Sequence, residues 1–447
     1  MGCRFLCNKR YEERINAMYA LVDCNNFFVS CERVFNPSLN NRPVIVLSSN
    51  DGCVIARSNE AKAAGIPMGI PVFKVRQVIE KGKFSVFSAN HVLYGDMSRR
   101  VMQLLSRFSS ELEVYSIDEA FLSLDGIKHD ELESYARHVR ETILKQIGIP
   151  VSIGIAPTKT LAKIASHIAK KGSVFRGACL LDKGDMLRDA LRFTPIHEVW
   201  GIGRRTAPLL QEKGIVTAYD FSRLPQTWVK KILTVEGEKT WMELNGKPCI
   251  SLDIQSPDKK SITSSRSFGD MVTTFDNLSE AVATFTSHCA ARLRRQKSCA
   301  GTLLVYIQSN RFRTEMEQYV NSFQVELPVP TNSDMELVHY ANLSLRRIYR
   351  DGIAYKRAGV VVSRIVPEEN IQMNLFDEVD RARHRKLMDA VDTINRKMGR
   401  GQVKLAARGI VSRWKPHNEY LSPCYTTNFK DILRVKADEG LPLKKEY

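Results

Sequence analysis

The chain has 447 residues, of which 43% are hydrophobic, and it carries a formal net charge of +17. At roughly 100–200 residues per domain this length predicts about two to four domains, and the hydrophobic fraction excludes a disordered chain. No apolar run approaches the roughly 18 residues that cross a bilayer, so no membrane association is expected. The excess of positive charge indicates a polyanionic partner, of which nucleic acid is the commonest.

The first folded element is expected at Met18, where "MYALVDCNNFF" reads as a strand. Further along, the periodicity predicts a strand over 42–48, a strand-to-helix turn over 53–66, a helix over 92–107, a hairpin around 116–121, a helix over 130–148, an alternating strand over 150–156 and a helix over 158–172. The pattern turns helical from about residue 185, and a third unit of mixed helices and strands begins near residue 264. This irregular mixture favours an antiparallel α+β layer over a doubly wound parallel sheet.

The cysteines and the N-terminus bear on the cellular compartment. Ten cysteines are scattered between Cys3 and Cys424, and their spacing forms no zinc or disulfide framework. This usage is typical of a reduced compartment, and we expect a cytoplasmic protein. Residues 1–17 have no long apolar core, so they predict a disordered N-terminal extension and not a signal peptide.

Two adjacent acids, Asp118 and Glu119, stand in the segment "SIDEAF" between two strand-like runs. A third acid, Asp23, ends the first predicted strand on the face that it shares with Leu21. If the two strands are neighbours, three carboxylates converge, and their close packing raises at least one pKa sharply. Two Mg²⁺ ions remove that cost and clamp the oxygens of a phosphoryl transfer. The alternative is that Asp118 and Glu119 are ordinary turn residues.

Phosphate groups also need cations on the protein. Lys159, Lys163 and Lys170 fall on one stripe of the helix "TKTLAKIASHIAKKG". Arg57 and Lys62 follow the second predicted strand. The alternative for each of these side chains is a place on a solvated helix face.

A set of sequence blocks resembles the Y-family translesion DNA polymerases, and within them the UmuC-type catalytic subunits of bacterial DNA polymerase V. The blocks are, in chain order, "ALVDCNNFFVSCE", "VIVLSSNDGCVIARSNEAKAAGIPMG", "YSIDEAFLSL", "GIAPTKTLAKIASHIAKK", "VWGIGRR", "SRSFG", "QMNLFD", "GRGQVKLAARGI" and "LSPCYTTNFKDILRVK". They run from about residue 18 to residue 436, which is nearly the whole chain. The first and third blocks are highly specific to the superfamily, and the tail blocks indicate the UmuC branch.

The resemblance implies an α+β right-hand polymerase with a ferredoxin-like palm, small fingers, a helical thumb and an α+β little finger. The implied domains are a palm at 18–26 and 90–178, fingers at 27–89, a thumb with a helix–hairpin–helix at 179–255, a little finger at 258–366 and a partner-binding C-terminal tail at 367–447. Residues 1–17 lie outside the resemblance.

The resemblance also implies roles for the residues around the acids. Asp23, Asp118 and Glu119 would bind two Mg²⁺ ions, with the backbone carbonyl of Cys24 as a further ligand. Phe28 takes the steric-gate position, where an aromatic ring blocks a ribose 2′-hydroxyl. Close relatives often carry Tyr at this position.

Lys62 and Lys170 match basic residues that touch the incoming triphosphate, and Arg57 is grouped with them as nucleotide-binding. A tyrosine that contacts phosphate in some relatives is matched here by Asn59. The exact nucleotide contacts are therefore expected to differ from those of the relatives, while the reaction is expected to be the same.

Two short motifs predict contacts with macromolecules. Gly201 and Gly203 in "GIG", followed by Arg204, resemble a helix–hairpin–helix loop whose N–H groups approach a DNA phosphate. The segment "QMNLFD" resembles the peptide that docks on the sliding clamp, and the alternative for it is a buried loop. Its predicted clamp-binding residues are Gln372, Met373, Leu375 and Phe376.

Together these features predict error-prone, template-directed DNA synthesis past lesions during the SOS response, with primer–template DNA and dNTPs as substrates. The partners implied by the resemblance are the sliding clamp, a dimer of processed UmuD and the RecA filament. Two rival functions are a palm-type nucleotide cyclase and a non-catalytic protein that binds damaged DNA. A cyclase needs neither a thumb nor a clamp peptide, and a binding protein does not need three converging acids.

Overall fold

The computed structural model of the chain consists of two compact units. The first comprises residues 18–47, 53–255 and 420–433 among those described, and the second comprises 48–52 and 257–419. The residues described are 18–171, 175–255, 257–377, 379–399, 401–410, 414 and 416–433. The predicted N-terminal extension at 1–17 and the chain from residue 434 onward lie outside them.

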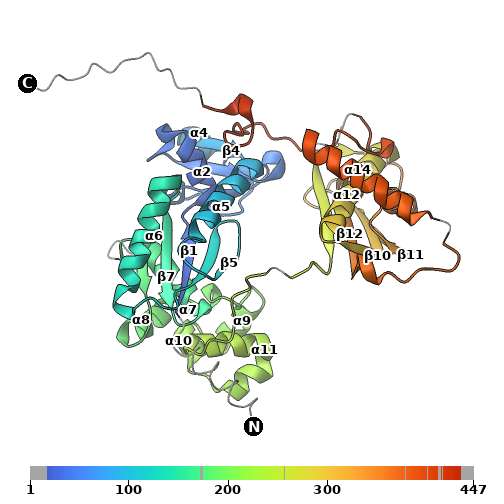
Figure 1. Cartoon of the computed structure of the whole chain (residues 1–447). Helices are drawn as coiled ribbons and strands as arrows, with labels where there is room; N and C mark the ends of the chain where they lie inside the picture. Colours follow the sequence, from blue (N-terminus) through green and yellow to red (C-terminus); the bar gives the residue numbers. More distant parts are fainter. Residues whose placement is uncertain are drawn as a thin grey trace, which may run out of the picture. The chain divides into compact units, whose positions relative to one another are not determined.

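A five-stranded sheet forms the centre of the first unit, with the strand order β5-β6-β1-β7-β8 (Figure 1). Its strands are β1 (Tyr19–Cys24), β5 (Leu112–Val114), β6 (Glu119–Ser123), β7 (Val151–Ala156) and β8 (Ala178–Leu180). The central strand β1 pairs antiparallel with β6 on one side and with β7 on the other. The condition that the strand of the "SIDEAF" hairpin neighbours the first strand is therefore met.

Alternation along β1 separates two cores. Ala20 and Val22 face a core that includes α5 (His91–Leu105) and α6 (Leu132–Ile147), whereas Leu21 faces the core under α7 (Lys159–Lys171). Because side chains in a strand alternate with a period of two, Asp23 lies on the same face as Leu21, beneath α7.

A glycine in β7 allows α7 to approach the sheet closely. A Cβ atom at Gly154 would lie 2.0 Å from the backbone nitrogen of Ser166 and 2.4 Å from the carbonyl oxygen of Ala162. Both atoms belong to the backbone of α7, so neither can move aside as a flexible side chain does. The absence of a side chain at Gly154 therefore sets the height of α7 above the ends of β1 and β6.

A smaller three-stranded sheet in the first unit has the order β3-β2-β4, with β2 and β4 parallel. Its strands are β2 (Val44–Leu47), β3 (Val54–Arg57) and β4 (Ser85–Ser88), and its helices are α2 (Phe27–Phe35), α3 (Asn59–Ala63) and α4 (Val72–Lys81). Four helices follow β8, namely α8 (Asp185–Phe193), α9 (Thr206–Gln211), α10 (Ala218–Ser222) and α11 (Gln226–Leu244).

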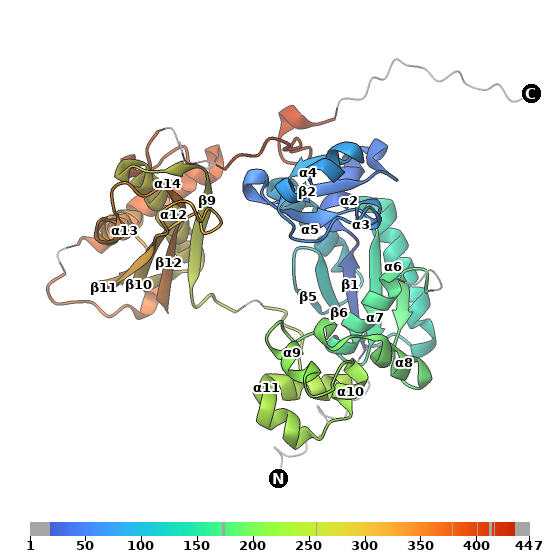
Figure 2. The same cartoon turned by 180° about the vertical axis from the view of Figure 1, so that it is seen from behind.

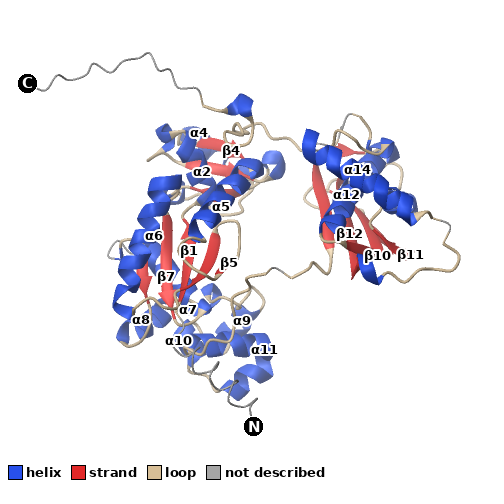
Figure 3. Ribbon diagram, in the orientation of Figure 1, coloured by secondary structure: helices blue, strands red, loops and turns tan. Residues whose placement is uncertain are grey.

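The second unit is an antiparallel sheet of order β11-β10-β12-β9 covered by helices (Figures 2 and 3). Its elements are β9 (Ile262–Val272), α12 (Phe275–Arg295), β10 (Ser298–Ser309), β11 (Val320–Thr331), α13 (Asp334–Ile348), β12 (Tyr355–Pro367) and α14 (Arg381–Met398). The α14 helix is tied to α12 by an ion pair between Arg294 and Asp392 at 2.7 Å.

The predicted α+β class is confirmed, and so are the predicted strand at residue 18, the helices near 92–107 and 130–148, and the alternating strand at 150–156. Every cysteine among the described residues is a free thiol. None of the described helices is long and apolar enough to cross a membrane.

Candidate active site

The three acids lie at adjoining ends of β1 and β6. Asp23 stands directly opposite Glu119 in the antiparallel register, and the backbone N–H of Cys24 donates to the carbonyl of Asp118 at 2.9 Å. Ser116 shapes the turn, because its hydroxyl accepts from the N–H of Glu119 at 2.9 Å and donates to the Asp118 carboxylate at 2.6 Å. Strand pairing and a serine-stabilised turn thus bring the three acids to the same edge of the sheet.

Two lysines of α7 reach down to these acids. Lys170 Nζ lies 2.7 Å from Asp23 Oδ1, and Lys163 Nζ lies 3.1 Å from Glu119 Oε2. The two lysines are seven residues apart, which is about two helical turns, so they project from the same face of α7. The backbone of α7 that approaches Gly154 belongs to Ala162, Ala165 and Ser166, and the two lysines lie beside that contact face.

Burial is the largest influence on the pKa values of Asp23 and Glu119. It raises the pKa of Asp23, and Asp118 raises this pKa further, while Lys170 and Lys163 lower it. Burial likewise raises the pKa of Glu119, against the opposing effect of Lys163. Half-buried carboxylates whose charged forms are disfavoured are stabilised by nearby cations. This donor set of hard oxygen atoms fits divalent ions such as Mg²⁺.

In the structure these carboxylates turn toward lysine and serine partners. Within the described residues, no three or more His, Cys, Asp or Glu side chains are grouped closely enough to enclose a metal ion. The ammonium groups of Lys170 and Lys163 supply the positive charge beside Asp23 and Glu119 in this structure.

Of the three lysines in the predicted stripe, only Lys163 and Lys170 lie beside the acids. Lys159 is only 2% exposed and pairs with Glu113, with Nζ and Oε2 2.6 Å apart. Its ammonium group also lies 4.6 Å from the centre of the Phe121 ring. The first turn of α7 is covered by surrounding residues, so Lys159 is part of a buried ion pair and does not face the acids.

The other predicted nucleotide-binding cations gather on α3 and its preceding strand. Lys62 Nζ donates to Asn26 Oδ1 at 2.6 Å and to Asn59 Oδ1 at 3.2 Å. Burial lowers the pKa of Lys62, and the charges of Lys170 and Arg57 lower it further. The Arg57 guanidinium donates to the carbonyl of Ile66.

Phe28 lies in the first turn of α2 and is half-buried. Its ring stacks on Tyr94 of α5, with the ring centres 4.5 Å apart and the planes at 16°. Sequence reasoning singled out Phe28 but missed Tyr94. Tyr94 lies within the predicted helix over 92–107, but that helical pattern does not indicate which ring Tyr94 contacts.

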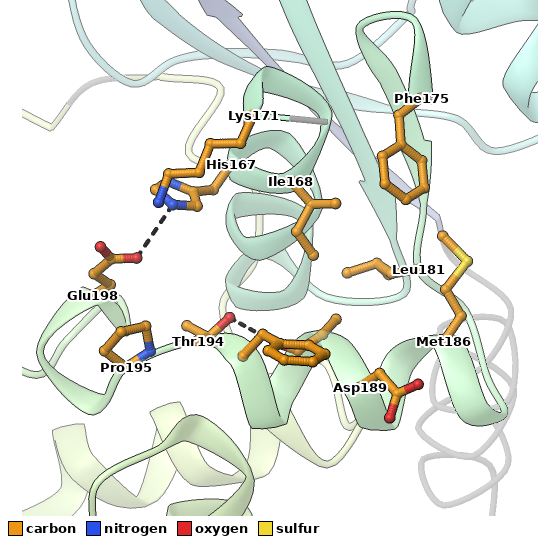
Figure 4. A pocket seen from close by; sticks show the side chains of 12 residues that line it. His167, Ile168, Lys171, Phe175, Leu181, Met186, Asp189, Thr194, Pro195 and Glu198 are labelled. Carbon is orange, nitrogen blue, oxygen red and sulfur yellow. Dashed lines mark hydrogen bonds and ion pairs between the residues drawn. The ribbon is translucent and has the colours of Figure 1, made fainter. Parts of the chain in front are cut away.

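Two pockets adjoin α7. A pocket of about 200 Å³ is lined by Asp23, Glu119 and the lysines above them, together with Trp200. A larger pocket of about 740 Å³ lies between α7 and α8 (Figure 4). His167 and Glu198, which are 3.2 Å apart, line both pockets. The paired acids belong to the smaller pocket, which is therefore the candidate reaction site.

The predicted helix–hairpin–helix loop precedes α9. Gly201 has φ = +91°, and a Cβ atom there would lie 2.4 Å from Thr240 Oγ1. Ile202 between the two glycines is buried, whereas Gly203 and Arg204 are exposed. The loop is thus anchored by one apolar side chain and presents its backbone and Arg204 to solvent.

The segment "QMNLFD" lies in the second unit and is exposed, as predicted. The exposed fractions are 60% for Met373, 91% for Leu375 and 85% for Phe376, and Gln372 is also exposed. The alternative of a buried loop is therefore wrong for this segment.

The fold, with its acids at one end of the central sheet, is shared with a solved polymerase structure. A solved Y-family DNA polymerase chimera superposes with a TM-score of 0.62 and 23% identity, covering 78% of this chain and 99% of that chain. The impB/mucB/samB family matches residues 22–167 and its C-terminal domain matches 259–375, while a domain of unknown function matches 385–435.

Curated relatives narrow the class. Protein UmuC of Salmonella typhimurium is 41% identical over 94% of this chain and 100% of its own length. Protein MucB of Escherichia coli is 38% identical over 93% of this chain, and DNA polymerase IV of Desulfatibacillum aliphaticivorans is 28% identical over 89%. The chain therefore belongs to the impB/mucB/samB family, the UmuC-type branch of the Y-family translesion DNA polymerases.

Proposed function

We propose that the chain extends a primer 3′-hydroxyl with dNTPs opposite damaged template bases, with low fidelity and as part of the SOS response. The observation that carries this proposal is the pairing of Asp23 with Glu119 across β1 and β6, with Asp118 at the adjoining turn. Asp23, Asp118 and Glu119, with the carbonyl of Cys24, are assigned as the ligands of two Mg²⁺ ions. Bound there, the ions supply charge that favours ionisation of the primer hydroxyl and neutralises the triphosphate.

The side chains around the acids bind and orient the nucleotide. Lys170, Lys62 and Arg57 lie within electrostatic range of one another, and their combined charge favours a polyanionic triphosphate beside Asp23. Phe28 is assigned as the steric gate: its ring occupies the space that a ribose 2′-hydroxyl requires. The stacked ring of Tyr94 supports Phe28 from behind.

The elements of the two units are assigned to the parts of a right-hand polymerase. The five-stranded sheet with α5, α6 and α7 is the palm, and the β3-β2-β4 sheet with its helices is the fingers. Helices α8 to α11 form the thumb, and the four-stranded sheet of the second unit is the little finger. The proposed boundaries are 18–26 and 90–178 for the palm, 27–89 for the fingers, 179–255 for the thumb, 258–366 for the little finger and 367–447 for the tail.

Partner contacts are assigned to exposed segments. Gly201, Gly203 and Arg204 approach the backbone phosphates of primer–template DNA. The exposed "QMNLFD" segment binds the sliding clamp. A dimer of processed UmuD and the RecA filament are the further proposed partners, and the proposed compartment is the cytoplasm.

Primer extension with one dNTP at a time tests the proposed activity. Incorporation directed by the template base, with release of pyrophosphate, is expected. A cyclase would instead convert a free nucleoside triphosphate without a primer, and a non-catalytic binding protein would shift the DNA in a gel without extending it. Either of those results would overturn the proposal.

A further inference from the structure

A segment near the C-terminus, called the returning segment below, belongs to the first unit although it follows the second unit in the sequence. Residues 257–419 belong to the second unit, and the described segment from Tyr420 to Leu433 packs against β4 and the start of α5 (Figure 1). Tyr420 exchanges two hydrogen bonds of 2.9 Å with Ser88, and Asn90 Nδ2 donates to the carbonyl of Ser422 at 2.9 Å. This segment falls within the part that matches a domain of unknown function.

The returning segment places a hydroxyl beside a buried carboxylate of α2. Glu32 is 2% exposed, and its Oε1 accepts from Ser422 Oγ at 2.9 Å and from Tyr94 Oη at 2.6 Å. Within the described part of the chain, no lysine, arginine or histidine forms an ion pair with Glu32. A buried carboxylate depends on such hydroxyl donors, because leaving its oxygens unsatisfied is costly.

The same tyrosine that donates to Glu32 packs on the proposed gate. Tyr94 is fully buried, and its ring stacks on Phe28. Phe28 and Glu32 are four residues apart on α2, so they share one face of that helix. Tyr425 of the returning segment also stacks on Phe35 of α2, with ring centres 4.7 Å apart. The segment therefore contacts α2 directly through Phe35 and Glu32, and through Tyr94 it reaches Phe28.

We propose that Ser422 is a positioning residue for sugar selection: through Glu32 it fixes Tyr94, and Tyr94 fixes the ring of Phe28. Ser422 and Tyr94 both donate to Glu32, so without the Ser422 hydroxyl only Tyr94 of these two donors remains. The carboxylate and the phenol then shift together, and the stacked ring of Phe28 moves with Tyr94. This positioning role rests on the proposed role of Phe28 as the steric gate.

The test measures the ratio of kcat/KM for a dNTP to kcat/KM for the matching rNTP in the full-length protein. This ratio does not depend on the fraction of active enzyme, so partial loss of folded protein does not affect it. For Ser422→Ala we expect the ratio to fall about three- to tenfold, the effect of losing one hydrogen bond. Tyr94→Phe, which keeps the ring and removes the hydroxyl, is expected to lower the ratio in the same direction. Ser422→Thr is expected to retain the parental ratio.

Two further variants separate the steps of this pathway. Thr427→Ala removes an exposed hydroxyl from the same segment and is expected to leave the ratio unchanged. In a Phe28→Ala background, Ser422→Ala is expected to have no additional effect, because coupled residues are not additive.

The outcomes distinguish the gate from its support. If Phe28→Ala relaxes sugar selection while Ser422→Ala and Tyr94→Phe keep the parental ratio, the positioning role is overturned and the gate stands. If Phe28→Ala itself leaves the ratio unchanged, the gate assignment fails and the positioning role fails with it. A Ser422→Ala effect that persists without the Phe28 ring would show that Ser422 acts by another route.

Discussion

The acids at the ends of β1 and β6 and the exposed "QMNLFD" segment are built in opposite ways. Asp23 and Glu119 are held by strand pairing and by lysines of a helix that packs tightly on the sheet. Leu375 and Phe376 are 91% and 85% exposed in a loop of the second unit. Chemistry requires fixed geometry, whereas recruitment requires accessible side chains. Substitutions in the two regions should therefore affect different measurements.

The largest effect is expected at Asp118. In Asp118→Ala, single-turnover insertion should fall by about 1,000-fold or more, because a charged group that stabilises the transition state is lost. Binding of primer–template DNA should remain close to the parental value, since basic side chains supply most of that affinity. Rapid-quench insertion and fluorescence anisotropy on the same DNA measure the two quantities.

Two variants control for this result. Asp125→Ala removes one negative charge from an exposed position at the other end of β6 and should insert normally. Asp118→Asn keeps an oxygen that can accept from Ser116 and should be as inactive as Asp118→Ala. Near-normal insertion by a folded Asp118→Asn protein would remove Asp118 from the proposed ligand set.

The second effect concerns how the site is held. Gly154→Ala should destabilise the first unit by about 3 kcal/mol, since the new methyl group meets the backbone of α7 and overpacks the interface. Urea unfolding followed by circular dichroism measures this change. The matched control is Gly95→Ala in α5, where a Cβ atom meets no other atom within 4 Å. That variant should be neutral or slightly more stable, and equal losses in both variants would contradict the close-approach argument.

Sequence patterns within single strands and helices predicted those features of the site that depend on residues close together in the chain. The alternation in β1 and the hairpin at "SIDEAF" indicated that Asp23 and Glu119 meet if their strands are neighbours, whereas the role of Lys170 came from the family resemblance. These patterns were not sufficient for Lys159, because its burial depends on Glu113 and on the covering of the first turn of α7.

Contacts between distant segments left little trace in the sequence. Glu32 is a single acid in a stretch for which the sequence predicted no role, and its partner Ser422 lies 390 residues further along the chain. No periodicity links two such positions. The network behind Phe28 could therefore be found only in the folded structure.

The third prediction tests the exposed region. Leu375→Ala combined with Phe376→Ala should leave insertion without the clamp unchanged but abolish stimulation by a loaded sliding clamp. Two apolar anchors contribute roughly 1.5–3 kcal/mol each when buried in a partner, which corresponds to about 100-fold or more in affinity. Primer extension with and without loaded clamp measures the difference.

A matched control for this experiment lies in the same unit. Phe312 is 79% exposed, and Phe312→Ala removes a similar apolar surface from a different loop. This variant should be stimulated as strongly as the parent protein. If the double variant is also stimulated fully, the clamp binds elsewhere.

The smallest effect is expected from the buried carboxylate behind Phe28. The pKa of Glu32 is raised above its ordinary value because the effect of burial exceeds the opposing effect of the hydrogen bonds from Tyr94 and Ser422. The titratable groups near Glu32 are Cys31, Tyr94 and Tyr425. Because the folded state holds this proton more tightly than the unfolded state, its contribution to stability is complete below the ordinary glutamate pKa. The contribution is then lost as the pH rises through the raised pKa of the folded state.

Glu32→Gln removes that titration while keeping an oxygen that can accept from both hydroxyls. At a pH below the ordinary pKa of a glutamate side chain, the variant and the parent should have similar free energies of unfolding. As the pH rises toward neutrality the variant should gain stability relative to the parent, because only the parent must ionise a buried carboxylate in its folded state. Urea unfolding of both proteins at several pH values measures this difference, in which all other titrating groups cancel. A difference that does not change with pH would mean that Glu32 keeps an ordinary pKa in the folded protein, and that its two hydroxyl donors fully compensate for its burial.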